Sequence, residues 1–276
     1  MDIKKIAVII SGQPRCLPWN AKYINLFLDT LDVQYDIYVC SDRGESERFS
    51  VLNNVKSFVG ISNDWQFSNR FCSVCDRPLH SGEISGLNSG DKQKLINYSK
   101  YRMVAIKDLP KKGQQAFKVG PPERQFLARH MLQWIKIYGA FISIKSTDHY
   151  DRILKLRSDI TFNYAGKNNK QDIKNYLHRE LFNGNFVGYA DRCFCGDVDA
   201  FEKLISWPFQ LNKYVQACPV KKLHWCDQLP TNYFKYVYNQ ETNYTSVFSL
   251  ITDSEQNKVG RNVKEVSPYE KDNIDK

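Results

Sequence analysis

The stretch KKIAVIISGQPR, residues 4–15, decides the fold class. Five apolar residues, Ile6 to Ile10, run directly into the polar sequence Ser-Gly-Gln-Pro-Arg. A short apolar run bounded by turn residues is typical of a buried strand. Residues 4–10 therefore predict an interior strand that ends in a tight and basic turn.

The residues that follow predict a second strand parallel to the first. Apolar side chains recur at helical spacing between Pro18 and Leu31, and Pro18 suits the first turn of a helix. The stretch YDIYVCSD, residues 35–42, is again a short apolar run that ends in polar residues. Strand, helix and strand make a βαβ unit, whose strands are parallel neighbours. The predicted fold class is α/β, with a mixed, mostly parallel central sheet flanked by helices.

The pattern after this unit is uneven. Residues 43–120 predict a variable insertion with short helices and strands, and residues 126–142 predict a long helix by their three- and four-residue apolar spacing. YDRILKLRSDITF, residues 150–162, predicts another buried strand, and residues 185–205 predict two strands followed by a helix.

Composition limits the classes of partner. The chain has 276 residues with a net charge of +9, which favours an anionic partner. The lysines are scattered and form no basic helix, so nucleic acid is disfavoured. No signal peptide and no apolar run of spanning length is apparent, so we expect a soluble, cytoplasmic protein. Residues 1–252 are predicted to form one domain, and residues 253–276 a polar tail.

The turn after the first strand is a candidate ligand site, because ligands of open parallel sheets bind beyond the carboxyl ends of the strands. Ser11 and Gln13 offer hydrogen bonds, and Gly12 allows a ligand to approach the main chain. Arg15 offers a planar fork that suits phosphate. Asp42 ends the second strand at the same edge. The turn matches neither common phosphate-loop motif, and a purely structural turn is the alternative.

A second candidate is Arg157-Ser158-Asp159, at the exit of the predicted strand within residues 150–162. A carboxylate at such a strand end can bind Mg²⁺ or Mn²⁺, which prefer oxygen ligands and bridge to phosphates of a substrate. The alternative is that Asp159 caps the local backbone.

Two later segments carry candidate acids and bases. Asp191 and Arg192 lie in the turn between two predicted strands. Asp227 follows Trp225 in the stretch HWCDQL, where the carboxylate could act as a general base on an acceptor hydroxyl and the indole could stack on a sugar ring. A helix N-terminal carboxylate beside a core tryptophan is the alternative.

Half of a structural zinc site is visible in FCSVCDRPLH, residues 71–80. Cys72 and Cys75 have CxxC spacing, and His80 follows five residues later. A zinc site needs a second pair of ligands, and ordinary thiols in a turn are the alternative. Candidates for that second pair, neither with standard spacing, are Cys193 with Cys195 and His224 with Cys226.

Five blocks, taken in order, resemble a known family. They are KIAVIISGQPR, YDIYVCSD, YDRILKLRSDITF, FVGYADRCFCGD and DQLPTNYF. The series resembles glycosyltransferase-like proteins of large DNA viruses and bacteria, related in pattern to the WavE lipopolysaccharide-synthesis family. The resemblance implies a GT-A-like fold and the transfer of a sugar from a nucleotide-sugar donor to a hydroxyl of a glycan acceptor. A non-catalytic relative that binds a glycan or a protein partner is the alternative.

The resemblance also implies roles for individual residues. Arg157-Ser158-Asp159 has one carboxylate where a full Asp-x-Asp motif has two, which leaves Asp159 as the implied ligand of Mn²⁺ or Mg²⁺. Asp191 and Asp227 are the candidate catalytic residues. The nucleotide contacts are expected at Ser11, Gly12, Gln13, Arg15, Asp42 and Arg157.

Overall fold

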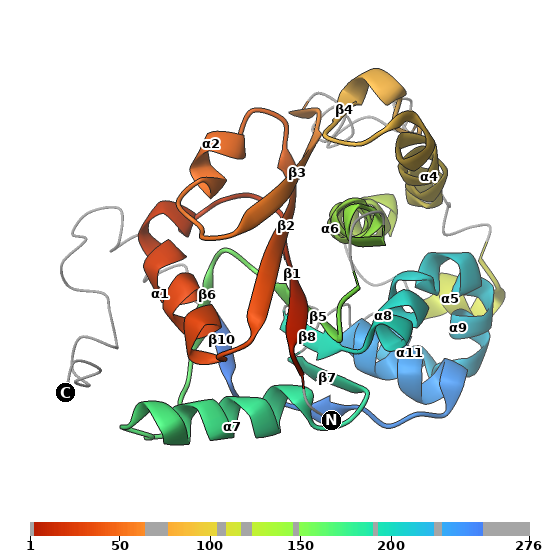
Figure 1. Cartoon of the computed structure of the whole chain (residues 1–276). Coiled ribbons are helices and arrows are strands. Elements are labelled where there is room, and N and C mark those ends of the chain that lie inside the picture. Colours follow the sequence, from red (N-terminus) through yellow and green to blue (C-terminus); the bar gives the residue numbers. More distant parts are fainter. Residues whose placement is uncertain are drawn as a thin grey trace.

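A central sheet organises this computed structural model, which describes residues 3–63, 77–103, 109–116, 123–145, 149–189, 193–223 and 228–250. Within these ranges the sheet has eight strands in the order β4-β3-β2-β1-β5-β8-β7-β9 (Figure 1). A second, two-stranded sheet pairs β6 (Ile160–Phe162) with β10 (Phe248–Leu250).

The first strand lies in the middle of the larger sheet. β1 (Lys5–Ser11) pairs in parallel with β2 (Gln34–Asp42) on one side and with β5 (Arg152–Leu156) on the other. β3 (Val55–Ile61) continues the parallel set beyond β2. The predicted βαβ unit is confirmed, with α1 (Leu17–Thr30) as its crossover helix.

The outer strands are mixed in direction. β4 (Ile84–Ser85) is antiparallel to β3, and β8 (Cys193–Gly196) is antiparallel to both β5 and β7 (Phe186–Tyr189). β9 (Asn243–Tyr244) runs parallel to β7. The prediction of an α/β fold with a mixed, mostly parallel sheet is therefore confirmed.

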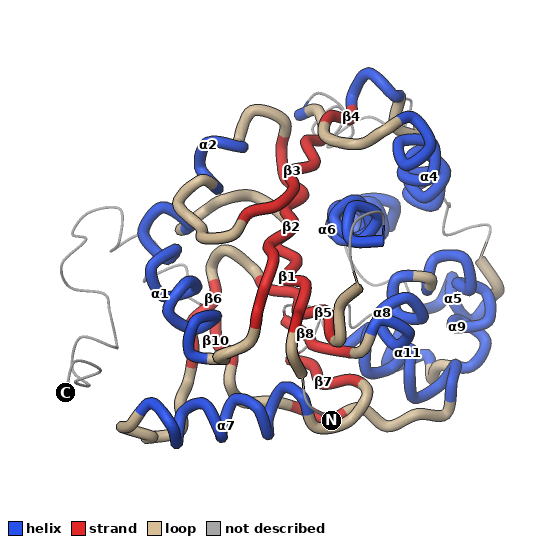
Figure 2. Tube along the Cα trace, viewed as in Figure 1, coloured by secondary structure: helices blue, strands red, loops and turns tan. Residues whose placement is uncertain are grey.

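Helices lie on both sides of the sheet (Figure 2), and an apolar core fills the space on each face. Ala7 and Ile9 of β1 face the core that contains α6 (Glu123–Lys145), whereas Ile6, Val8 and Ile10 face the core of α1 and α7 (Lys170–Phe182). A strand that is buried on both faces needs apolar residues at every position, which explains the unbroken run in β1. The other helical segments of the described ranges are α2 (Ser46–Phe49), η1 (Ser81–Glu83), α4 (Ser89–Ser99), η2 (Lys100–Met103), α5 (Lys111–Ala116), α8 (Val198–Ile205), η4 (Trp207–Gln210), α9 (Leu211–Ala217), α10 (Val220–Leu223) and α11 (Leu229–Tyr238).

Part of the predicted insertion belongs to the sheet. Residues 43–120 contribute β3 and β4, and α4 packs on α6 through Tyr98, whose ring stacks on Tyr138 at a centroid distance of 4.1 Å. The described part of this segment is therefore built into the core and does not stand apart from it. None of the helices in the described ranges combines the length and the apolar character that crossing a membrane requires.

A substitution at Gly86, directly after β4, tests the placement of that edge strand. Its φ is +81°, and a Cβ atom there would lie 2.0 Å from the carbonyl oxygen of Phe58 in β3. Gly86→Ala should therefore lower the free energy of unfolding by about 2–4 kcal/mol, through backbone strain and a clash with main chain. Gly82→Ala is the matched control and should cost less than about 1 kcal/mol, because no atom of the described residues lies within 4 Å of a Cβ built there. Urea denaturation measures both, and equal costs would contradict this placement of β4.

Candidate functional site

Three strand ends meet at one edge of the sheet. β1 ends at Ser11, β2 ends at Asp42, and the chain leaves β5 at Leu156. Because both neighbours are parallel to β1, their carboxyl ends lie beside its own. The turn at Arg15 thus contacts Asp159, although the two residues are 144 positions apart in sequence.

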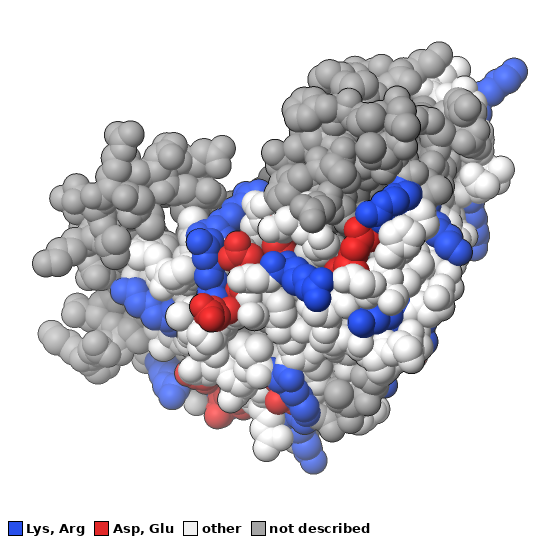
Figure 3. Space-filling model, turned by 90° about the horizontal axis from the view of Figure 1, so that it is seen from above, with Lys and Arg blue, Asp and Glu red and all other residues white. Residues whose placement is uncertain are grey.

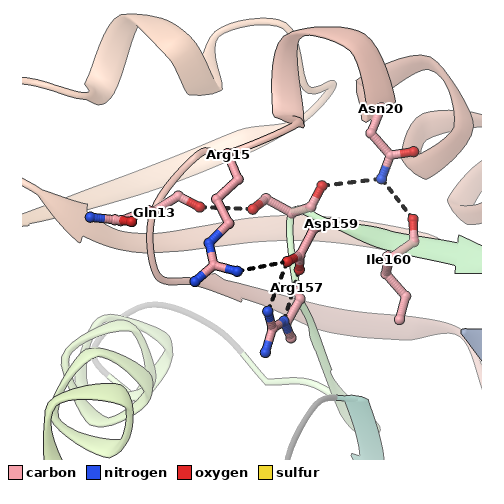
Figure 4. Close-up of polar contacts among 7 residues, drawn as sticks. Gln13, Arg15, Asn20, Arg157, Asp159 and Ile160 are labelled. Carbon is pink, nitrogen blue, oxygen red and sulfur yellow. Dashed lines mark hydrogen bonds and ion pairs between the residues drawn. The ribbon is translucent and has the colours of Figure 1, made fainter. Parts of the chain in front are cut away.

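Hydrogen bonds fix this turn on both sides. The Gly12 N–H donates to the Cys40 carbonyl at 3.1 Å, and the Ser41 hydroxyl donates to the Gly12 carbonyl at 2.6 Å. On the other side, the Ser158 hydroxyl donates to the Gln13 carbonyl at 2.8 Å (Figure 4). The turn is therefore held between β2 and the loop that follows β5.

The turn borders space that the described residues leave open. Gly12 has φ +108°, and a Cβ atom built on it would meet no other described residue within 4 Å. A ligand group can therefore approach the main chain here. The Ser11 hydroxyl is buried and finds no hydrogen-bond partner among the described residues, whereas the Gln13 side chain is exposed.

A buried carboxylate joins two arginines at this edge (Figure 4). Arg157 binds Asp159 side-on, with Nε to Oδ1 and Nη2 to Oδ2 both at 2.8 Å, and Arg15 donates from Nη1 to Oδ2 at 3.2 Å. The Asp159 side chain is 2% exposed, whereas that of Arg157 is 24% exposed and that of Arg15 is 50% exposed. The predicted residues Arg15, Arg157 and Asp159 therefore form one cluster.

The charge state of Asp159 follows from its surroundings. Burial disfavours the charged carboxylate, but the hydrogen bonds and charge of Arg157, with the charge of Arg15, outweigh burial and hold the pKa of Asp159 below its ordinary value. The three side chains together carry one net positive charge, and the partly exposed surface of the cluster is cationic.

This arrangement does not fit a divalent cation at Asp159. Both carboxylate oxygens already accept hydrogen bonds from guanidinium groups, so Mg²⁺ or Mn²⁺ would compete with the arginines for these oxygens. No group of three or more His, Cys, Asp or Glu side chains comes together in the described part of the chain. The role of Asp159 as a metal ligand stays a prediction, and the contacts favour a role in holding the arginines.

Asp42 lies at the predicted edge, but its cationic partner belongs to a helix and not to the arginine cluster. Its carboxylate forms an ion pair with Lys136 of α6, and both side chains are about 5% exposed or less. Sequence reasoning missed Lys136, for which the available signal was a charge between Ile135 and Ile137, within the mostly apolar residues 134–144 of the helix. It also missed Lys155, a lysine within β5 that is 1% exposed and has its Nζ 5.6 Å from the centroid of the Phe194 ring.

The predicted zinc ligands are only partly described. His80 is exposed and precedes η1, where its backbone N–H donates to Glu83 Oε2 at 2.8 Å. Cys193 and Cys195 are buried in β8, and burial raises the pKa of each thiol to about 12, so both are protonated core residues. Zinc ligation requires the thiolate, which this environment disfavours. Predictions that lie outside the described residues are Cys72, Cys75, Asp191, His224, Cys226 and Asp227.

Comparisons of this chain with protein-family models, curated proteins and solved structures find no match. The resemblance to glycosyltransferase-like proteins therefore stays a prediction.

The buried pair of Asp42 and Lys136 should be costly to break. Lys136→Met leaves the Asp42 carboxylate buried without its cation and should lower the free energy of unfolding by about 3–5 kcal/mol, and adding Asp42→Asn should recover part of this loss. The control is Lys145→Met on the same helix, which removes an exposed pair with Glu202 and should cost less than about 1 kcal/mol. Urea denaturation measures all three variants. Equal losses from the two single lysine variants would contradict the burial of this pair.

Asp159 should stabilise the fold in a pH-dependent way. Because its folded pKa is lowered, its contribution is fully present above the unfolded pKa of about 3.9 and is lost as the pH falls through the folded value. Asp159→Asn should therefore cost about 1–3 kcal/mol at pH 7, and the cost should shrink below about pH 4. Asp32→Asn is the control: it breaks an exposed ion pair with Lys174, Asp32 is 68% exposed, and its φ of +51° is one that asparagine tolerates, so it should cost less than about 1 kcal/mol. A cost that stays constant down to the acid transition would contradict the ionised state of Asp159.

Proposed function

We propose that this chain is a glycosyltransferase with a GT-A-like fold, which moves a sugar from a nucleotide-sugar donor to a hydroxyl of a glycan acceptor. The observation that carries the proposal is the meeting of Arg15 and Arg157 on one buried carboxylate, beside the open turn at Gly12. Three separate blocks of the family resemblance contribute to this edge of the sheet.

The edge suits the diphosphate of a donor. Guanidinium groups bind phosphate through paired hydrogen bonds, and both arginines are partly exposed. α1 begins at Leu17, directly after the turn, and has no acidic residue in its first turn. The partial positive charge at the start of this helix therefore adds to the attraction for an anion.

The chemistry requires charge stabilisation on the leaving group. The bond between the anomeric carbon and the diphosphate oxygen breaks, and a bond between that carbon and the acceptor oxygen forms. Arg15 and Arg157 would stabilise the negative charge that develops on the departing diphosphate. The acceptor proton passes to a base, for which Asp227 and Asp191 remain the proposed residues.

The surface charge gives no support to a nucleic-acid partner. Figure 3 shows Lys and Arg side chains interspersed with Asp and Glu on the described part of one face. Nucleic-acid binding is favoured by a clustered basic patch or stripe. A small anionic donor is a better match for a compact pair of arginines.

A nucleotide screen tests this function. At least one nucleoside diphosphate among UDP, GDP, CDP and ADP should raise the melting temperature by several degrees at a large excess over Kd. Arg15→Ala should weaken that binding about tenfold or more, since it removes a charge-assisted contact. Arg179→Ala, an exposed arginine on α7 with 67% side-chain exposure, is the control and should leave Kd unchanged.

Measurement of turnover distinguishes a transferase from a non-catalytic relative. Release of the nucleoside diphosphate from the matching nucleotide sugar, in the presence of glycan acceptors, should follow for a transferase. Binding without any hydrolysis or transfer would instead identify a non-catalytic relative. If no nucleotide diphosphate or nucleotide sugar binds, the proposed function is wrong.

A further inference from the structure

Both oxygens of the buried Asp159 carboxylate accept hydrogen bonds from arginines, whereas a metal ligand would direct an oxygen at the cation. We infer that Asp159 is a positioning residue, which holds Arg157 and Arg15 as a diphosphate-binding pair so that donor binding needs no divalent cation. This inference deepens the proposed function and rests on it for the identity of the ligand. It assigns to two arginines the charge neutralisation that the family resemblance assigns to Mn²⁺ or Mg²⁺.

The geometry of the two arginines is unequal. Arg157 places a whole edge of its guanidinium, Nε and Nη2, against Asp159, and such a side-on pair fixes the plane of the group. Arg15 uses only Nη1, and half of its side chain remains exposed. Within the described residues, Nε and Nη2 of Arg15 have no acceptor, so this edge of the guanidinium can donate hydrogen bonds to a phosphate oxygen.

The loop that carries the carboxylate is rigid on both sides of Asp159. The side-chain amide of Asn20 in α1 donates to the Ser158 carbonyl at 3.1 Å and to the Ile160 carbonyl at 2.7 Å (Figure 4). The Ser158 hydroxyl holds the Gln13 carbonyl in turn. Asp159 is therefore fixed between two clamped peptide units, as a residue that positions other side chains should be.

Electrostatic repulsion explains why a carboxylate lies between the two arginines. Two guanidinium groups so close together repel each other, and Asp159 between them reduces that repulsion. A divalent cation at the same oxygens would lie beside both guanidinium groups and would be repelled by them. A phosphate has the opposite sign and can bind without displacing either arginine.

Calorimetric titrations with and without metal test the inference. Inorganic pyrophosphate, UDP, GDP, CDP and ADP would each be titrated into the full chain in excess EDTA and again in excess MnCl₂. We expect pyrophosphate and at least one nucleotide to bind with about the same Kd in both buffers. Asp159→Asn should weaken both by about tenfold or more in EDTA, because the arginines lose their fixed orientation. Asp32→Asn, at the exposed carboxylate, should leave Kd unchanged.

A second variant covers the case in which Asp159→Asn does not fold. Arg157→Lys keeps the positive charge but cannot form the side-on pair, so it should weaken pyrophosphate binding in EDTA while the circular dichroism spectrum stays that of the parent. Unchanged binding by Arg157→Lys would overturn the inference.

The outcomes distinguish the inference from the proposed function. Binding that appears only with MnCl₂ would overturn the inference and leave the glycosyltransferase proposal intact. Binding of pyrophosphate alone, equal in both buffers and weakened in the variants, would support the arginine site and contradict a nucleotide donor. If no probe binds in either buffer, both are wrong.

Discussion

The parallel pairing of β1 with both β2 and β5 is the constraint on which the rest of the structure depends. It buries β1 on both faces, and it brings three strand ends to one edge. Every residue of the candidate site that the structure describes is placed by this pairing: the turn after β1, Asp42 at the end of β2, and Asp159 just beyond β5. The hydrogen bonds of Ser41, Ser158 and Asn20 then hold the turn and the loop at fixed separation.

Each of the two buried carboxylates at this edge is paired with a cation. Asp42 and Asp159 are both nearly inaccessible, and each pairs with a cation from a different part of the chain, Lys136 for Asp42 and Arg15 for Asp159. The two pairs differ in their access to solvent, because Lys136 is buried whereas Arg15 is half exposed. The Asp42 pair is therefore internal, and the Asp159 cluster presents positive charge to whatever lies outside. Such a surface is suited to recognising an anion.

The sequence alone was sufficient to predict the helices and strands whose apolar residues have a simple periodicity. β1, α1, β2, β5 and α6 have apolar patterns that depend only on local spacing, so they were predictable. β3 was not predicted as a strand. Its first residues, Val55 and Lys56, are exposed, so only its second half has the pattern of a buried strand. The residues of the edge were also predictable, because polar residues follow each buried run. Their partners were not, since Arg15 with Asp159 and Asp42 with Lys136 are contacts across 144 and 94 positions that no local pattern encodes.

The interlock between the turn and the loop after β5 has a consequence for the folding of the chain. The N-terminal βαβ unit contains Arg15 but cannot form the arginine cluster alone, because Arg157 and Asp159 arrive only with β5. Contacts of such high sequence separation require closure of a long loop, which slows folding and delays these contacts relative to local helices. During synthesis from the N-terminus, the first 150 residues therefore emerge without the proposed anion-binding edge. If the edge binds an anion as proposed, that affinity arises only when β5 docks against β1, and its appearance would indicate that the central sheet is complete.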